Sequence, residues 1–358
     1  MRYSTLCKIK GYSIIILTLI FSNINGQDIQ FSQFYSAPLY LNPAFAGSAH
    51  HYRGILHQRL QWPNITGKFT TSLFSFDKYF NKYKSGIALM AIQDYQGTNA
   101  ISSSQVGLQY AYELHVSEKL TIRPGLQLDY VSKSLNYDVL RFPRNFDSTG
   151  YLGGAMPQDL TGRKSFADVS TGVVLYSDKL WVAISAHHIN TPNQSFLGNV
   201  SRLPAKFTFI SGYKIPLTKK VEHESVVEDV KDISITPTVH YKFQGKSDQL
   251  DLGLYGIYDQ ALIALWYRGI PIKQYHAEYV IGNQIFDQKF PNNESMVVVL
   301  GWMWKSISIT YSYDFTISKL SQARTGGSHE LNLTFIQHKH HKSVKPMRRL
   351  PCPHFYKK

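Results

Sequence analysis

Strict alternation of apolar and polar residues near the end of the chain constrains the fold more than any other feature. Across residues 306–315 the odd positions are isoleucine, tyrosine or phenylalanine, and the even positions are serine, threonine or aspartate; residues 330–335 alternate in the same way. A period of two gives a β-strand one apolar and one polar face. In a soluble sandwich the polar face points to solvent. In a membrane barrel, by contrast, Leu333 would face lipid, and Asp314 and Glu330 would face a polar lumen.

The rest of the chain favours the barrel. About fourteen strand-like segments recur, most of them long enough to cross a bilayer at a tilt, and an even number is typical of bacterial single-chain barrels. We predict strands at 53–61, 68–76, 85–94, 103–114, 119–132, 166–176, 180–189, 205–215, 233–243, 248–258, 261–268, 295–304, 306–315 and 329–337.

Composition agrees with a membrane barrel. Aromatic residues make up 14% of the 358 residues, and charged residues only 17%, which is low for a soluble protein. Charges that do fall in mid-strand, such as Glu113, Arg123 and Asp129, need water or a partner, and a lumen supplies them. Four tryptophans near strand ends are expected to form an interfacial girdle. They are Trp181, Trp266, Trp302 and Trp304.

The first residues indicate export. Arg2 and two lysines precede an apolar run and a small, polar exit, so residues 1–26 are predicted to be a cleaved signal peptide. No later run reaches the roughly 18 apolar residues of a membrane helix. Cys352 is then the one thiol left, and it forms no internal disulfide. Removal of the signal peptide takes three positive charges from the net charge of +14 and leaves a basic mature chain. Its surface could contact lipopolysaccharide, an acidic partner or nucleic acid, but export argues against nucleic acid.

Residues 27–52 do not alternate. Their aromatic residues are interrupted by prolines and glycine, which predicts a short helix or compact turn. We expect this stretch to be docked in the periplasmic mouth of the barrel or to act as a plug; the alternative is a packing segment with no partner. Residues 53–337 are then the transmembrane barrel, and residues 338–358 a basic periplasmic tail.

Connection lengths predict the orientation. Barrels of this class have short periplasmic turns and longer outer loops. The short connections include 116–118, 177–179 and 259–260, and the long ones are 133–165, 190–204, 269–294 and 316–328. This pattern places both termini in the periplasm, with 216–232 as a long inner exception.

Several sequence blocks resemble those of the PorP/SprF family of outer-membrane proteins associated with the type IX secretion system. They bracket nearly the whole mature chain, and together they are specific. The blocks are QDIQFSQFY at 27–35, LYLNPAFAG at 39–47, YSYDFTIS at 311–318, GGSHE at 326–330 and PCP at 351–353. One departure is Ile29, which stands where the family often has proline.

The resemblance implies an outer-membrane barrel that assists secretion or surface attachment of a protein with a C-terminal sorting domain, such as a large adhesin. Implied partners are outer-membrane lipid, the sorting domain, and periplasmic or lipoprotein components of the machinery. The candidate partner-binding residues come from the same blocks. They are Phe31, Phe34, Tyr35, Tyr40, Asn42, Phe45, Tyr313, Asp314, Phe315, His329 and Glu330.

Other chemistry is not expected. His338, His340 and His341 have no cysteine or carboxylate nearby to complete a metal site. No Gly-x-Ser-x-Gly elbow or phosphate-binding glycine loop is present, so we predict neither an enzyme nor a cofactor. The alternative function is a diffusion channel or small-ligand transporter, with Glu113, Arg123, Asp129 and Asp314 lining its pore.

Overall fold

The computed structural model describes residues 28–65, 67–97, 100–136, 146–147, 150–151, 162–196, 199–218, 233–281, 284–318, 324–337 and 350–351. The signal peptide expected at residues 1–26 lies outside this part of the chain. The basic tail expected at 338–358 also lies outside it, apart from Leu350 and Pro351, which are buried.

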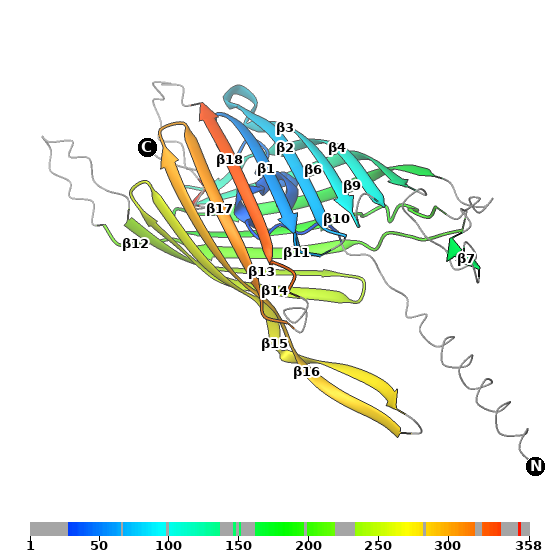
Figure 1. Cartoon of the computed structure of the whole chain (residues 1–358). Helices are drawn as coiled ribbons and strands as arrows, with labels where there is room; N and C mark the ends of the chain where they lie inside the picture. The colour runs from blue at the N-terminus through cyan, green and yellow to red at the C-terminus, as the bar shows by residue number, and fades with distance from the viewer. Residues whose placement is uncertain are drawn as a thin grey trace, which may run out of the picture.

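Within the described residues, fourteen antiparallel strands close into a barrel (Figure 1). Its strands are β1 (Tyr52–Gln61), β2 (Phe69–Phe80), β3 (Ser85–Gln96), β4 (Ile101–Tyr112), β6 (Leu120–Leu135), β9 (Arg163–Tyr176), β10 (Leu180–His187), β11 (Lys206–Tyr213), β13 (Ile233–Gln244), β14 (Ser247–Tyr258), β15 (Ala261–Ile281), β16 (Gln284–Trp304), β17 (Ile307–Thr316) and β18 (Ser328–Gln337). The ring closes where β1 pairs with β18 and where β11 pairs with β13.

Four shorter elements accompany the ring. Two continue barrel strands, β5 (Leu114–Ser117) after β4 and β12 (Ile215–Pro216) after β11. A separate small hairpin consists of β7 (Phe146–Asp147) and β8 (Gly150–Tyr151). The turn after β2 contains the short 3-10 helix η3 (Asn81–Tyr83).

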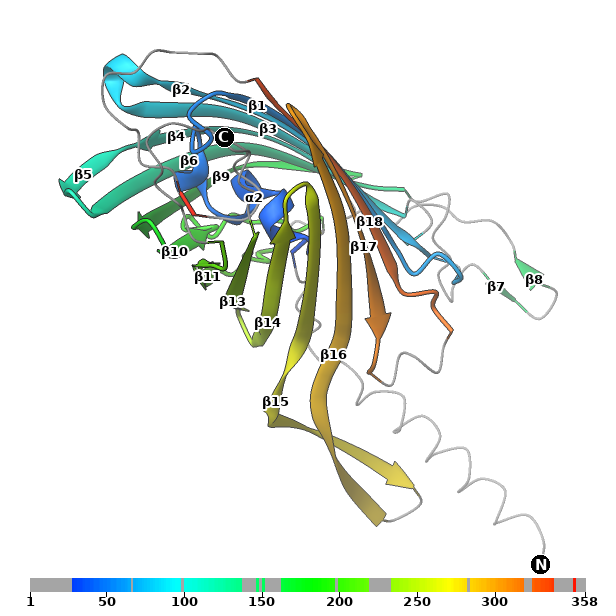
Figure 2. The same ribbon diagram turned by 90° about the vertical axis from the view of Figure 1, so that its left-hand side faces the viewer.

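The predicted barrel is confirmed, and each predicted segment overlaps a barrel strand. The largest difference is the hairpin of β15 and β16, whose strands have 21 residues each, whereas the predicted strands covered 261–268 and 295–304. Register shifts at Arg268/Gly269 and at Ile270/Gln274 interrupt the alternation, although the pairing continues beyond them. Figure 2 shows this ribbon bending away and projecting past the rim.

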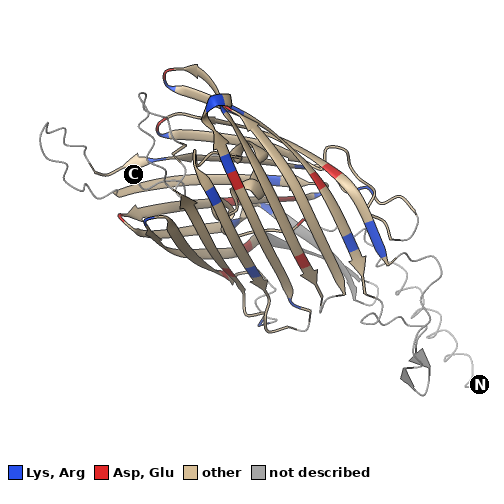
Figure 3. Cartoon of the chain, turned by 90° about the horizontal axis from the view of Figure 1, so that it is seen from above, with Lys and Arg blue, Asp and Glu red and all other residues tan. Residues whose placement is uncertain are grey.

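The two faces of the strands follow the membrane assignment. Leu108 is 61% exposed and Leu331 53% exposed on the outside of the barrel, while Asp314 and Glu330 are buried on the inside. Figure 3 shows how few charged positions interrupt the strands. The apolar face is therefore the lipid face and the polar face lines the lumen, as the alternation predicts for a barrel.

The predicted tryptophan girdle is wrong for two of its four residues. Trp302 and Trp304 are exposed on the outside, but Trp181 and Trp266 are buried inside the barrel. Their strand parity places them on the lumen face, and glycines leave room for them. A Cβ at Gly212 would lie 2.7 Å from the Trp181 indole nitrogen, and one at Gly253 would lie 1.9 Å from the Trp266 ring.

Residues 28–50, called here the N-terminal segment, form short helical turns inside the barrel (Figure 2). The turns are η1 (Phe34–Ser36), α2 (Pro38–Leu41) and η2 (Pro43–Phe45). A proline begins each of the last two, where its missing N–H costs nothing. Asn42 caps η2 by accepting a 2.8 Å hydrogen bond from the Ala44 amide. In the described part of the chain, no helix is long and apolar enough to span a membrane.

Glycines in the barrel wall let the N-terminal segment approach backbone to backbone. A Cβ on Gly86 would lie 2.1 Å from the Ala46 carbonyl oxygen, and a Cβ on Gly125 would lie 2.3 Å from the Ala44 nitrogen. Only a residue without a side chain fits at such distances. The wall strands β3 and β6 are therefore shaped to the segment that they enclose.

The two rims of the barrel differ. Tyr52 pairs with Gln337 at one rim, and the tight turns at Gln260 and Ser306 hydrogen-bond to the ends of neighbouring strands there. We call this the short-turn rim. The opposite, long-loop rim carries the connection 188–205 and the projecting β15–β16 ribbon. In outer-membrane barrels the short turns face the periplasm.

This orientation predicts a labelling pattern. In a Cys352→Ser background, Lys246→Cys in the β13–β14 turn should react with a membrane-impermeant maleimide on intact cells, because this turn lies at the long-loop rim. Lys179→Cys, at a lysine that is also exposed but lies at the short-turn rim, should react only after the outer membrane is permeabilised. The reverse pattern would mean that the barrel is inserted the other way round.

The glycine contacts predict a loss of stability. Gly86→Ala should lower the free energy of unfolding by about 1–3 kcal/mol, because the added methyl group displaces either the wall or the N-terminal segment. Denaturant titration followed by tryptophan fluorescence measures it. Gly54→Ala is the matched control, since its Cβ would meet nothing within 4 Å. Equal effects of the two substitutions would contradict the close contact.

Candidate functional site in the barrel lumen

The N-terminal segment runs the length of the lumen, from the long-loop rim to the short-turn rim. Asp28 lies beside Gln244, the last residue of β13, and beside Lys206, the first residue of β11. Gly47, near the other end, donates a 2.8 Å hydrogen bond from its amide to Asp77, near the end of β2 at the short-turn rim. The segment thus passes the whole barrel before it enters β1. Asp28 therefore lies at the rim opposite to the periplasmic rim at which the start of the mature chain was predicted.

Asp28 is held at the long-loop rim by two cations. Its carboxylate lies 2.7 Å from His188 Nε2 and 2.8 Å from Lys206 Nζ. Burial alone would lower the pKa of His188, but the carboxylates of Asp28 and Asp168 outweigh it and raise this pKa to about 9. Burial would likewise raise the pKa of Asp28, yet Lys206 and His188 hold it well below its usual value. At neutral pH these contacts are ion pairs.

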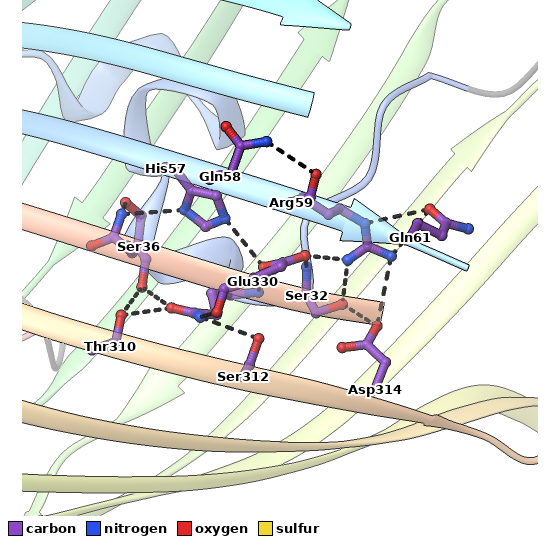
Figure 4. A network of polar contacts seen from close by, with 12 residues as sticks. Ser32, Ser36, His57, Gln58, Arg59, Gln61, Thr310, Ser312, Asp314 and Glu330 are labelled. Atoms are coloured by element: carbon purple, nitrogen blue, oxygen red, sulfur yellow. Dashed lines mark hydrogen bonds and ion pairs between the residues drawn. The ribbon is translucent and has the colours of Figure 1, made fainter. Parts of the chain in front are cut away.

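The centre of the site is a network around Glu330 on β18, which we call the anchor network (Figure 4). The Glu330 carboxylate accepts hydrogen bonds from the main-chain amides of Ser32, at 2.6 Å, and Gln33, at 2.8 Å. The same carboxylate forms an ion pair with Arg59, and His57 Nε2 lies 3.2 Å from it. These residues are all buried, so Glu330 joins the N-terminal segment to β1.

Asp314 on β17 extends the anchor network along the wall to β15 and β14. It accepts a hydrogen bond from the Ser32 hydroxyl and lies 3.2 Å from Arg268 on β15 and 3.7 Å from Arg59. Arg268 in turn donates a 2.9 Å hydrogen bond to Asp251 on β14. Charges from four strands therefore meet around Ser32, and Asp251 on a fifth strand pairs with one of them, Arg268. Their mutual pairing makes their burial tolerable.

Aromatic side chains of the segment fill the middle of the lumen. Phe34 packs on Trp266, with ring centroids 4.9 Å apart. Tyr35 lies edge-on to Tyr255 at 4.6 Å and to Trp181 at 5.3 Å. Rings in these arrangements add about 0.5–1.5 kcal/mol per pair beyond the area they bury. The two tryptophans misplaced in the predicted girdle are thus the walls of an aromatic pocket.

Toward the short-turn rim, arginines bind the segment. Arg123 donates hydrogen bonds to the carbonyls of Ala44, at 3.3 Å, and Ala46, at 2.6 Å, and forms an ion pair with Glu113. The other arginine, Arg53, forms an ion pair with Asp77 and donates a hydrogen bond to the Phe45 carbonyl. Of the four charges predicted to line a pore, Glu113, Arg123 and Asp314 are engaged in these contacts, whereas Asp129 accepts a 2.7 Å hydrogen bond from Gln127.

The structure separates the predicted partner-binding residues into two groups. One group lies in the lumen: Phe31, Phe34, Tyr35, Asn42, Phe45, Asp314 and Glu330 are buried there, and Tyr40 is half-buried. The other group faces outward: Tyr313, Phe315 and His329 lie on the lipid side of β17 and β18, where Tyr311 contacts His329 at 2.8 Å. Neighbours such as Asp314 and Phe315 cannot share a site, because adjacent strand residues face opposite ways.

Some lumen residues were missed by the sequence analysis, above all Arg59 and Arg268. Both fall on the polar face of their strands, and an arginine at such a position needs a partner, which is the feature that could have revealed them. Their partners come from strands far away in the sequence. The partners of these two arginines could therefore be identified only from the closed barrel.

Two cavities flank the outer half of the N-terminal segment. One lies beside Asp28 and is lined by Lys242, Gln249 and Glu294 among others. The second lies against Phe34 and Tyr40. In the described part of the chain, no group of three or more histidines, cysteines, aspartates or glutamates is placed to hold a metal ion. His338, His340 and His341 lie outside that part.

Solved structures of outer-membrane barrels resemble this one. Omp33 of Acinetobacter baumannii is 6% identical, with a TM-score of 0.41, and the match covers 80% of this chain and 98% of that one. A KdgM porin is 9% identical, with a TM-score of 0.33, covering 80% and 99%. A TodX mutant described as a monoaromatic hydrocarbon channel is 10% identical, with a TM-score of 0.41, covering 83% and 92%. No curated protein matches the chain.

A family model gives the identity that these structures do not. The model described as type IX secretion system membrane protein PorP/SprF matches residues 23–335, which include the N-terminal segment and nearly the whole barrel. The resemblance drawn from the sequence blocks is confirmed. The chain belongs to the PorP/SprF family of type IX secretion system membrane proteins.

Proposed function

We propose that this protein assists the secretion or surface attachment of an exported protein that carries a C-terminal sorting domain, such as a large adhesin. As a membrane component of the type IX secretion system, it works with other parts of that machinery in the outer membrane. In this proposal the finer partners are the sorting domain and periplasmic or lipoprotein components. Residues 27–52 serve as a plug that keeps the lumen closed to diffusion.

The observation that carries the proposal is the occupied lumen. A diffusion channel needs a continuous, water-lined path, and its charged residues face that water. Here Arg123 and Arg59 form ion pairs with carboxylates, and Arg123 also donates a hydrogen bond to the N-terminal segment. The segment also fills the centre with aromatic rings, so the polar wall supports a docked peptide better than a pore.

Because the N-terminal segment fills the lumen, we expect partners to bind on the outside of the molecule. Phe34, Tyr35 and Phe45 are buried, so in our proposal they hold the plug and do not touch a partner. Phe315 is 51% exposed on β17, near the long-loop rim, and His329 lies on the same face. We assign the long-loop rim, with these aromatic residues at its edge and with the projecting β15–β16 ribbon, to the surface that meets the exported protein.

Deleting the gene tests the secretion role. We expect quantitative comparison of surface and culture-fluid proteins with the parent strain to show loss of one large protein with a sorting domain, if the barrel is a dedicated adaptor. Loss of the whole sorting-domain class would instead make it a core component. An unchanged set of secreted proteins would contradict the proposal and favour the channel.

Conductance tests the plug. The purified protein should pass little current in planar bilayers, whereas a variant that lacks residues 31–47 should open a pore, because the deletion removes the aromatic centre of the lumen. A variant with the same residues in scrambled order is the control for composition. Steady conductance by the unaltered protein would argue for a diffusion channel.

A further inference from the structure

The cavity beside Asp28 lies at the long-loop mouth of the barrel and is called here the mouth pocket. The N-terminal segment and the strands β11, β13, β14 and β16 contribute to its lining. The anchor network around Glu330 uses none of the charged side chains that line it. These charged side chains are Asp28, Lys206, Lys242, Asp248 and Glu294.

Ion pairs compensate three of these five charges. Lys206 Nζ lies 2.8 Å from the carboxylate of Asp28, so the charge on β11 and the charge on the N-terminal segment pair with each other. Asp248 forms an ion pair with Lys273 on the β15–β16 ribbon. Two charges of opposite sign then remain in the mouth pocket.

Lys242 and Glu294 carry these two charges. Within the described ranges of the chain, neither of them forms an ion pair. Both side chains are half-buried, so part of their surface is removed from water. A charge in such a position gains from a partner of opposite sign. The mouth pocket therefore has a place for one anionic group and one cationic group.

A β-bulge turns the side chain of Glu294 into the mouth pocket. Met296 on β16 is 41% exposed on the outside and Val297 is buried on the inside, so alternation alone would place residue 294 outside. The ladder, however, pairs Ser295 and Asn293 with consecutive residues of β15 and leaves Glu294 as an extra residue. Extra residues of this kind redirect a side chain, and bulges are common next to functional sites.

The main chain around the bulge is fixed by its neighbours. Gly269 on β15 has a φ of 143°, and a Cβ there would lie 2.4 Å from the Asn292 carbonyl oxygen, so only glycine fits. The Glu294 carbonyl accepts hydrogen bonds from the amides of Ile317, at 3.1 Å, and Ser318, at 3.3 Å. The position of the carboxylate is therefore set by the fold.

Lys242 reaches the mouth pocket through ordinary alternation. Thr238 and His240 are buried on the lumen face of β13, and Lys242 continues that face near the end of the strand. Two strands, β14 and β15, separate Lys242 from Glu294 around the ring. The ammonium group and the carboxylate thus come to one pocket from different parts of the wall.

From this arrangement we propose that the mouth pocket binds a small zwitterion, a molecule with one carboxylate and one ammonium group, such as a free α-amino acid. The carboxylate of the ligand pairs with Lys242, and its ammonium group pairs with Glu294. The ligand enters from outside the cell, because the long loops of such barrels face the medium. This inference does not rest on the secretion role.

Ligands that lack one charged group test the two contacts separately. The full-length purified protein in detergent is titrated in a calorimeter with L-alanine, with N-acetyl-L-alanine, which lacks the ammonium group, and with L-alaninamide, which lacks the carboxylate. We expect each blocked compound to bind at least about 10-fold more weakly than alanine, because each loses one charge-assisted hydrogen bond.

Two variants assign the contacts to residues. Lys242→Met should bind alanine and alaninamide equally, and Glu294→Gln should bind alanine and N-acetylalanine equally. Each comparison is made within one preparation, so incomplete folding would change the number of sites and not the ratio of affinities. Lys246→Met, the control, removes an exposed lysine from the β13–β14 turn at the same mouth and should leave all three affinities unchanged.

Two results would overturn the proposal. The first is that alanine does not bind to the unaltered protein at any concentration up to its solubility. The second is that alanine and its two blocked derivatives bind with equal affinity. Either result would mean that Lys242 and Glu294 are solvated charges of the barrel mouth and not a binding site.

Discussion

The ion pair between Arg59 and Glu330 couples closure of the barrel to what the barrel encloses. These residues face each other in register across the seam where β1 meets β18, the first strand and the last. Glu330 also accepts the amides of Ser32 and Gln33, so the seam and the N-terminal segment share one carboxylate. Removing one partner of such a buried pair costs about 3–5 kcal/mol. Ring closure and docking of the segment therefore stabilise each other.

The same reasoning explains why the lumen tolerates so much charge. Arg268, Arg123 and Arg53 each meet a carboxylate from another strand or an oxygen of the N-terminal segment. A fourteen-stranded ring is too wide for its own side chains to fill completely. The N-terminal segment fills this space and also pairs polar groups of the wall. In an open pore, water would pair those groups. Wall groups that would face water in an open pore are here paired with the N-terminal segment or with each other.

The strands could be read from the sequence because side-chain alternation is local, and the predicted segments agree with the barrel apart from the long β15–β16 ribbon. Part of the lumen could be read too: Asp314 and Glu330 were assigned to it from parity alone. Strand alternation also places Trp181 and Trp266 inside the barrel, where they are buried. Their positions near strand ends, by contrast, led to the prediction of an interfacial girdle. The candidate partner-binding residues mix both faces of the wall, because a block of sequence contains residues that face the lumen, such as Glu330, beside residues that face outward, such as His329.

Sequence by itself determined the strands, the two faces of the wall, the number of strands in the ring and the family, since each depends on residues near one another along the chain. Only the tertiary structure decided which charges meet, where the aromatic pocket lies, and that the N-terminal segment crosses the lumen from the long-loop rim. Arg59 and Glu330 are far apart in sequence, and nothing local pairs them. Their contact exists because closing the barrel brings the first and last strands together.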